Sequence, residues 1–207
     1  MVVDSGLRPT GLNQGSSVEQ TAEPRSPLTA VAFAYAGTAA VALLVLPHLR
    51  SPLERFAAPH HGAVVLGWDP GRGLLWGVGV GAALAAAGQA ATRFTAWGRR
   101  LQAVIGRLVG GIHPADAVLL AALSAAAEEL VFRGMLLPYV GLWVSSALFG
   151  LAHLVPREGL WPWSAWTAGA GLVLGWVALR TGGLLAPMIA HFLVNAVGLL
   201  LLSRQDG

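Results

Sequence analysis

Uncharged stretches long enough to cross a lipid bilayer recur along this sequence and restrict its possible folds more than any other feature. Residues 26–49, 73–92, 134–156, 159–179 and 181–203 contain no Asp, Glu, Lys or Arg. About 20 apolar residues suffice to cross the hydrocarbon core. Only 11% of the chain is charged, whereas a soluble domain has about 25% charged residues. We therefore predict an all-α fold, a polytopic transmembrane helical bundle.

The limits of the apolar stretches predict about six spans. The predicted spans are 27–49, 72–92, 114–137, 141–156, 161–179 and 183–203. Residues 1–26 are polar and lack an apolar core, so we predict a disordered N-terminal tail and not a cleaved signal peptide. Residues 56–68 are too short to span, and we expect an interfacial or re-entrant segment there.

The segment between the second and third spans has the pattern of an amphipathic helix. Its apolar residues recur at i, i+3, i+4 and i+7, namely Leu101, Val104, Ile105 and Leu108, beside Arg99, Arg100 and Arg107. This pattern predicts a helix lying on the membrane surface. The alternative is a solvated loop helix that covers the bundle. Residues 27–113 would thus comprise the N-terminal spans and this surface helix.

Arginine supplies all of the basic side chains and predicts the orientation. The same loop contains Arg93, Arg99, Arg100 and Arg107, which favours a cytoplasmic loop and places both termini in the cytoplasm. No basic run is dense enough for nucleic-acid binding, so the expected partners are membrane lipid and a peptide or protein substrate. The absence of cysteine excludes disulfides, thiolate metal sites and a cysteine nucleophile.

Charged side chains inside the third predicted span indicate a functional site, because charges within a membrane are costly. Glu129 and Arg133 are an i, i+4 pair on one helix face. Glu128 points to a different face, so it needs a partner on another helix or must take up a proton. The alternative interpretation is a structural polar cluster that joins helices.

Two later spans contain further polar side chains. Phe149 and His153 share a face of one helix, and His191 and Asn195 share a face of another. Each pair alone is compatible with ordinary hydrogen bonding between packed spans. Together with Glu128 they form the set that hydrolysis requires. Glu128 and His153 would activate a water as general base, and His191 and Asn195 would donate to the developing oxyanion.

Three motifs in order resemble those of a known family. Glu128-Glu129-x-x-x-Arg133, Phe149-x-x-x-His153 and His191-x-x-x-Asn195 are similar to the motifs of the CAAX prenyl protease and bacteriocin-processing family, whose bacterial members are often called Abi proteins. The resemblance covers residues 114–203. It implies an intramembrane endopeptidase in which Glu128 is the catalytic carboxylate, His153 shares in water activation, and His191 and Asn195 form the oxyanion hole.

The same resemblance implies that Glu129 and Arg133 maintain the geometry of the site, and we expect structural support from Phe149. A glutamate-type mechanism without a cofactor is favoured, because no His-Glu-x-x-His zinc motif is present. A zinc site formed by Glu128, His153 and His191 stays open. The substrates would be membrane-associated or C-terminally anchored peptides or proteins.

Other protein classes remain as alternatives. The second hypothesis is a non-catalytic membrane immunity or scaffold protein that keeps the motifs as structural contacts. A proton-coupled transporter is a third, because intramembrane Glu and His also mark proton pathways. The expected location is the bacterial inner membrane.

Overall fold

The computed structural model describes residues 27–48, 63–109 and 111–204, and every regular element in them is helical. The predicted tail 1–26 and most of the predicted interfacial segment 56–68 lie outside the described residues. The elements are α1 Pro27–Val45, η1 Leu46–His48, α2 Ala63–Leu66, α3 Pro70–Phe94, α4 Ala96–Val109, α5 Pro114–Glu129, η3 Leu130–Leu136, α6 Leu137–Ala152, α7 Trp161–Thr181 and α8 Leu185–Ser203. The predicted all-α helical bundle is confirmed.

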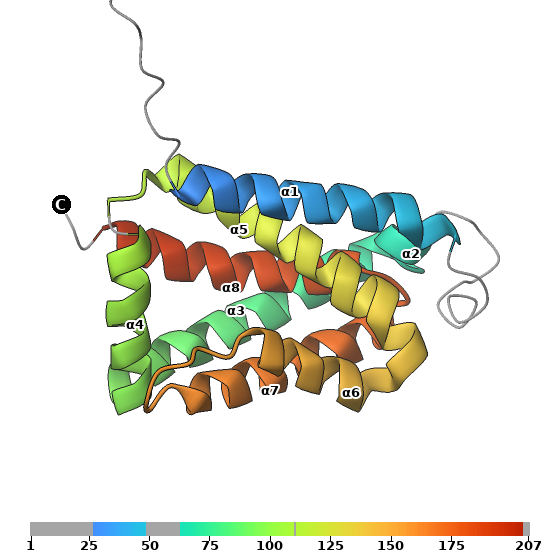
Figure 1. The fold of residues 1–207 in the computed structure, drawn as a ribbon. Helices are drawn as coiled ribbons and strands as arrows, with labels where there is room; N and C mark the ends of the chain where they lie inside the picture. The colour runs from blue at the N-terminus through green and yellow to red at the C-terminus, as the bar shows by residue number, and fades with distance from the viewer. Residues whose placement is uncertain (1–26, 49–62, 110, 205–207) are drawn as a thin grey trace, which may run out of the picture.

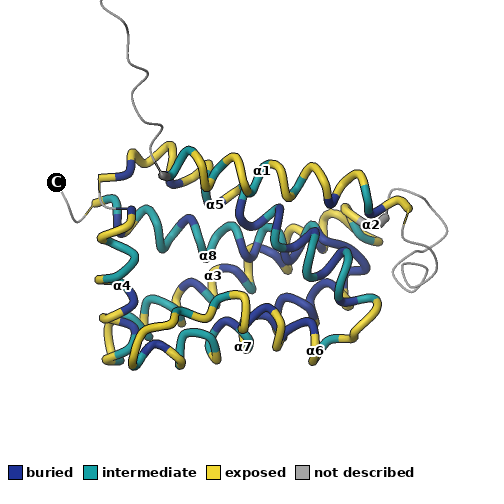
Figure 2. Tube along the Cα trace, viewed as in Figure 1, coloured by how far each residue is buried: buried dark blue, intermediate teal, exposed yellow. Residues whose placement is uncertain are grey.

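Figure 1 shows the long helices running side by side, with successive long helices along the chain running in opposite directions and α4 lying across one end of the bundle. Helix α8 is central, since it contacts α3, α5 and α7, while α1 packs on α5 and α6 packs on α7. The tube in Figure 2 shows the consequence for burial: dark, buried segments concentrate where α5, α6, α7 and α8 meet, and α1 is largely exposed.

The predicted number of about six spans is wrong by the criteria of length and composition. Within the described residues, four helical runs are long and apolar enough to cross a membrane: Leu28–His48, Pro70–Phe94, Pro114–Ala152 and Leu185–Ser203. The predicted span 114–137 and most of the predicted span 141–156 lie in the third run, which is 39 residues long and ends at Ala152. Helix α7 does not qualify, because its Trp, Ser, Thr and Gly residues lower its mean hydropathy.

The 39-residue run is not straight. Gly141 has φ 78° and ψ 173°, which lies outside the helical region and separates the first turn of α6 from the rest. A positive φ of this kind suits glycine, because glycine lacks a Cβ. In Figure 1, α6 runs back beside α7 after this point. The reversal allows residues near both ends of α6 to face the centre of the bundle.

Small residues allow the helices that bear the motifs to approach closely. Gly77 and Gly81 lie on the face of α3 that meets α8, and a Cβ added to Gly81 would lie 2.8 Å from the Cα of Ala190. On α6, a Cβ added to Gly150 would lie 2.6 Å from the carbonyl oxygen of Ser164 in α7. Small residues at such contacts are typical of membrane helices, where close backbone packing replaces the hydrophobic effect.

The segment predicted as an amphipathic surface helix forms α4, and its apolar stripe divides between two environments. Leu101 is buried, and Ile105 packs against the cluster that contains Val109, Ala117 and Leu202. Leu108, by contrast, is 70% exposed. Helix α4 therefore covers the end of the bundle with one side, as the alternative interpretation expected, and presents Leu108 and its arginines outward. Its position relative to a membrane surface stays a prediction.

Candidate active site

The third predicted span changes its helical geometry where its charged residues lie. Glu128 and Glu129 end α5, and the chain continues directly into η3, a seven-residue π-helix that contains Arg133. In the wider π-helix the backbone carbonyl groups no longer pair with the N–H groups that they would bond in an α-helix. The Phe132 carbonyl oxygen accepts a hydrogen bond of 2.9 Å from Ser145 of α6. Segments of π-helix often occur at functional sites.

Glu129 and Arg133 form a fully buried ion pair. Arg133 Nη1 lies 2.8 Å from Glu129 Oε1, and the two side chains are 2% and 0% exposed. Arg133 also donates through Nη2 to the Gly171 carbonyl oxygen of α7 at 3.2 Å, and its guanidinium carbon lies 4.4 Å from the centre of the Phe149 ring. The predicted i, i+4 pair is confirmed, and it links η3 to α6 and α7.

The same oxygen of Glu129 binds His191. His191 Nδ1 lies 2.7 Å from Glu129 Oε1, and the His191 side chain is buried. Because the carboxylate is next to an arginine and accepts a hydrogen bond from it, we assign Glu129 as ionised and the proton to His191 Nδ1. Nε2 of His191 is then directed to Glu128, at 3.8 Å from Oε2.

Glu128 faces the two histidines from the other side. Its Oε2 lies 3.5 Å from His153 Nε2, and this oxygen is buried without a hydrogen-bond partner among the described residues. His153 Nδ1 lies 2.8 Å from the Phe149 carbonyl oxygen. A carbonyl oxygen only accepts, so His153 Nδ1 bears the hydrogen and Nε2 of neutral His153 presents a lone pair to Glu128. Glu128 thus has the partners on other helices that its position predicted.

Asn195 is held by a residue that the sequence motifs do not include. Its Nδ2 donates to Ser124 Oγ of α5 at 3.0 Å. An amide nitrogen has two hydrogens, so the second stays available for another acceptor. Ser124 in turn donates to the carbonyl oxygen of Ala121 at 3.2 Å, which fixes the direction of its hydroxyl.

A small cavity lies beside these groups. His153, His191, Asn195 and Phe149 line it together with residues of α3 and α7, including Trp163, and its volume is about 60 Å³. A water needs about 10–15 Å³ of such volume. The cavity therefore has room for water molecules next to the imidazoles. The Phe149 ring lies close to both imidazoles. Its centre is 4.5 Å from that of His153 and 5.7 Å from that of His191.

Three contributors were missed by the sequence analysis. Ser124 binds Asn195, Trp163 lies 6.1 Å from the His153 ring, and the Tyr35 side chain of α1 hydrogen-bonds Glu128. Ser124 lies four residues before Glu128 on α5, but the contacts of all three residues are made with other helices, so no spacing along the chain predicts them. The one available signal was a polar side chain in an otherwise apolar span, which membrane helices use sparingly.

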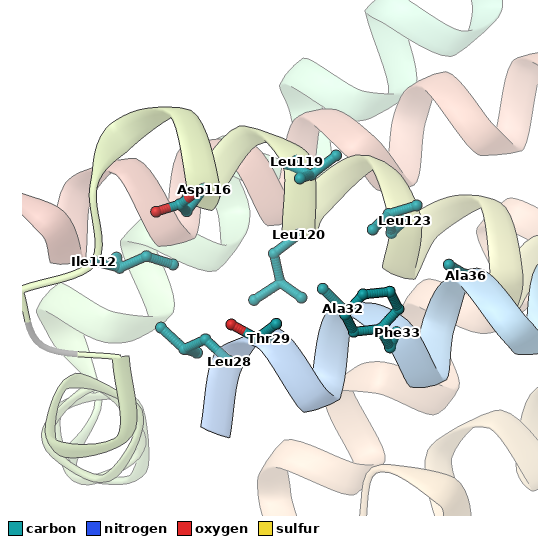
Figure 3. Close-up of a pocket in the computed structure, with 10 residues that line it drawn as sticks. All are labelled: Leu28, Thr29, Ala32, Phe33, Ala36, Ile112, Asp116, Leu119, Leu120 and Leu123. Carbon is teal, nitrogen blue, oxygen red and sulfur yellow. The ribbon is translucent and has the colours of Figure 1, made fainter. Parts of the chain in front are cut away.

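A larger cavity between α1 and α5 contains none of the motif residues. Figure 3 shows its lining, with Leu28, Ala32 and Ala36 on α1 facing Leu120 and Leu123 on α5 and with Asp116 at one end. Its volume is about 380 Å³. Its lining is apolar apart from Thr29 and Asp116, so it brings no second titratable side chain beside Asp116.

The donor set fits a metal only in part. The Nε2 atoms of both histidines face Glu128 and their Nδ1 atoms are hydrogen-bonded, as in many metal sites. However, in the described part of the chain no group of three or more His, Cys, Asp or Glu residues is arranged to hold a metal ion.

Comparison with known protein families finds a match to the part of the chain that contains this site. Residues 111–197, which include all three motifs, match the family model described as Rce1-like, type II CAAX prenyl endopeptidase. The predicted resemblance is confirmed for this region. The uncharacterized protein YpbD of Bacillus subtilis strain 168 is 36% identical over 80 residues, which cover 39% of this chain and 42% of that relative. The match thus spans less than half of the relative's length, and no solved structure matches.

Proposed function

From the match of residues 111–197 to the Rce1-like type II CAAX prenyl endopeptidases, we propose that this protein is an intramembrane endopeptidase. It would hydrolyse peptide bonds of membrane-associated or C-terminally anchored peptides and proteins. The observation that supports it most directly is the convergence of Glu128 Oε2 on His153 Nε2 at 3.5 Å and on His191 Nε2 at 3.8 Å. These side chains come from three helical segments, and His153 and His191 also line a cavity with room for water.

The first step of the proposed reaction is water activation. Ionised Glu128 accepts a proton from a water that also donates to the lone pair of His153 Nε2. The water oxygen then bonds to the carbonyl carbon of the scissile peptide. Two acceptors around one water raise its nucleophilicity and fix its position, which is the usual contribution of general base catalysis. The Phe149 carbonyl oxygen holds the required tautomer of His153.

The second step is stabilisation and collapse of the tetrahedral intermediate. His191 donates from Nε2 as an imidazolium, whose charge Glu129 balances through Nδ1, and Asn195 donates its second amide hydrogen. Preorganised donors of this kind lower the barrier when charge develops on the carbonyl oxygen. The carbon–nitrogen bond then breaks, the proton held by Glu128 passes to the leaving amine, and the new carboxylic acid loses its proton to His153.

Substrate access requires movement of helices. A cavity of about 60 Å³ accepts water but not a peptide segment. An extended residue advances the chain by about 3.3 Å and brings its side chain with it. The proposed enzyme would therefore separate neighbouring helices to admit substrate, which limits cleavage to flexible segments.

The test compares purified wild type with Glu128→Gln in liposomes containing a quenched fluorescent peptide library. Glu128→Gln removes the base while nearly preserving shape, so we expect a loss of cleavage of at least about a hundredfold. Glu158→Gln is the matched control, because Glu158 is exposed in the loop between α6 and α7. Full cleavage by Glu128→Gln would refute the proposed base.

Each alternative has its own outcome in this experiment. Loss of wild-type cleavage on chelation, with recovery on adding zinc, would support a metal held by Glu128, His153 and His191 in place of the glutamate mechanism. Equal biological function of wild type and Glu128→Gln in cells would support the immunity or scaffold protein. Proton flux across the liposomes would support the transporter. The location in a bacterial inner membrane is part of the proposal.

A further inference from the structure

Tyr35, which lies outside the family-matched region, makes a contact with the proposed catalytic carboxylate. It is part of α1, which packs on α5, and the Tyr35 side chain interacts there with the Glu128 carboxylate. The phenol O–H donates and the carboxylate accepts. The proposed base thus receives contacts from α1, in addition to those from His153 and His191.

The packing of α1 explains why Tyr35 faces inward. Tyr35, Ala39, Ala42 and Leu46 are spaced at i, i+4, i+7 and i+11, which places them on one side of a helix. Ala42 and Leu46 are buried in a cluster with Leu130, two residues after Glu128 in the chain, and Ala39 packs against the same cluster. This side of α1 therefore faces the junction of α5 and η3.

The opposite side of α1 is exposed and apolar. Val41 and Leu44 are among the exposed large hydrophobic residues. In a membrane these side chains would face lipid, where a phenol hydroxyl would find no partner. The inward direction of Tyr35 thus gives its hydroxyl an acceptor and supplies the carboxylate with a donor.

We propose that Tyr35 is a positioning residue of the active site, which holds the Glu128 carboxylate so that Oε2 stays directed at His153 and His191. A carboxylate turns about its terminal bond with a broad preference. Oε2 itself has no hydrogen-bond partner among the described residues. The histidines therefore do not restrict the rotation of the Glu128 carboxylate, whereas a donor from α1 does. This inference rests on the proposed function, and it makes α1 part of the catalytic unit.

A structural role alone would have a different signature. If Tyr35 only packed α1 on α5, its phenyl ring would suffice and Tyr35→Phe would act like wild type. If it positions the carboxylate, loss of the hydroxyl lowers kcat with little change in KM, because the reacting geometry and not substrate binding is affected. Replacing a hydrogen bond to a charged group corresponds to a loss of roughly ten- to a hundredfold.

The experiment uses the full chain in liposomes and measures two quantities. The first is kcat and KM on a peptide that wild type cleaves. The second is the infrared carboxyl band of Glu128 in protein with isotopically labelled glutamate, assigned by its loss in Glu128→Gln. Tyr35→Phe should lower kcat and shift the Glu128 band, since the band depends on hydrogen bonding. Tyr35→Gln, which restores a donor, should recover part of kcat.

The chain provides a matched control in Tyr139→Phe. Tyr139 is the second of two tyrosines, it is 52% exposed, and its replacement should alter neither kcat nor the band. A Glu128 band at the wild-type frequency in Tyr35→Phe would overturn the inference, whatever the rate. If the wild type cleaves the peptide and Tyr35→Phe has an unchanged kcat and an unchanged band, the positioning role of Tyr35 is refuted and the proposed endopeptidase function stands. If the wild type cleaves none of the peptides but the Glu128 band shifts in Tyr35→Phe, the result counts against the endopeptidase function and supports the contact between Tyr35 and Glu128.

Discussion

Glu129 binds two partners through one oxygen atom, although it is not the residue that faces the proposed reaction. Its Oε1 lies 2.8 Å from Arg133 Nη1 and 2.7 Å from His191 Nδ1. Neither Glu129 nor Arg133 has appreciable contact with solvent. The pair therefore determines the electrostatic balance of the core and keeps a proton on His191 Nδ1, which leaves Nε2 facing Glu128.

Replacing Glu129 by Gln should strongly destabilise the protein. The Arg133 guanidinium would stay buried without a counter-charge, and breaking a buried ion pair in this way costs about 3–5 kcal/mol. Thermal unfolding in detergent, followed by circular dichroism, measures the effect as a fall in Tm. An unchanged Tm would show that Arg133 does not depend on Glu129.

The double variant Glu129→Leu, Arg133→Met separates stability from chemistry. Replacing both charges by apolar groups of similar size is often neutral or stabilising, so Tm should recover. Cleavage should not recover, because His191 loses the carboxylate on Nδ1. Recovery of both would show that the pair contributes only to stability.

Helical spacing in the sequence predicted several of the neighbours that the structure shows. Glu129 with Arg133, and His191 with Asn195, were expected on common helix faces, and Glu128 was expected to need a partner from another helix. The ion pair at 2.8 Å confirms the first expectation. His191 and Asn195 both line the small cavity, and Glu128 Oε2 lies 3.5 Å from His153 Nε2. Ser124 and Tyr35 were not predictable, because their partners are distant in sequence and lie on other helices.

At the scale of the elements, the contact between α3 and α8 controls the position of His191. Gly81 faces α8 so closely that an added Cβ would lie 2.8 Å from the Cα of Ala190, the residue before His191. Backbone atoms cannot yield as a flexible side chain can. The helices would have to separate to accept any larger residue here.

Gly81→Ala should therefore destabilise the bundle and reduce cleavage together. Overpacking of a close contact costs about 1–3 kcal/mol, which exceeds the gain of up to about 1 kcal/mol from the higher helix propensity of Ala. The measurements are Tm in detergent and the rate of peptide cleavage.

Gly79→Ala on the same helix is the control. Nothing lies within 4 Å of a Cβ added to Gly79, so only the propensity gain acts and Tm should stay equal or rise slightly. Similar losses for both variants would show that the flexibility of α3, and not its contact with α8, is what matters.

At the scale of the whole molecule, the arginines among the described residues are distributed unequally between the two ends of the bundle. One end contains the C-terminal ends of α3 and α8 and all of α4 (Figure 1), and with them Arg93, Arg99, Arg107 and Arg204. Arg100 lies against Gly159, so the loop with Arg157 is at this end too. Arg72 and Arg180 begin α3 and end α7 at the opposite end. This asymmetry supports a cytoplasmic location for the α4 end.

Single cysteines can test this orientation, because the natural chain contains none. Ala103→Cys on α4 should react with a membrane-impermeant maleimide only after cells are permeabilised. Arg72→Cys at the start of α3 should react in intact cells. Both positions are exposed, so accessibility within the protein does not bias the comparison. The reverse labelling pattern would invert the proposed topology.

The sequence alone determined the class of fold and pointed to the polar side chains of the candidate site. Charge-free stretches require helices in lipid, because backbone groups there must bond within their own segment, and the cost of intramembrane charge identified Glu128, Glu129 and Arg133. Local spacing could not determine how the spans traverse the bundle. Two predicted spans form one helical run that reverses at Gly141, and α1 supplies Tyr35 to a site that otherwise lies in the C-terminal half. These features depend on packing between segments distant in sequence, so only the tertiary structure decided them.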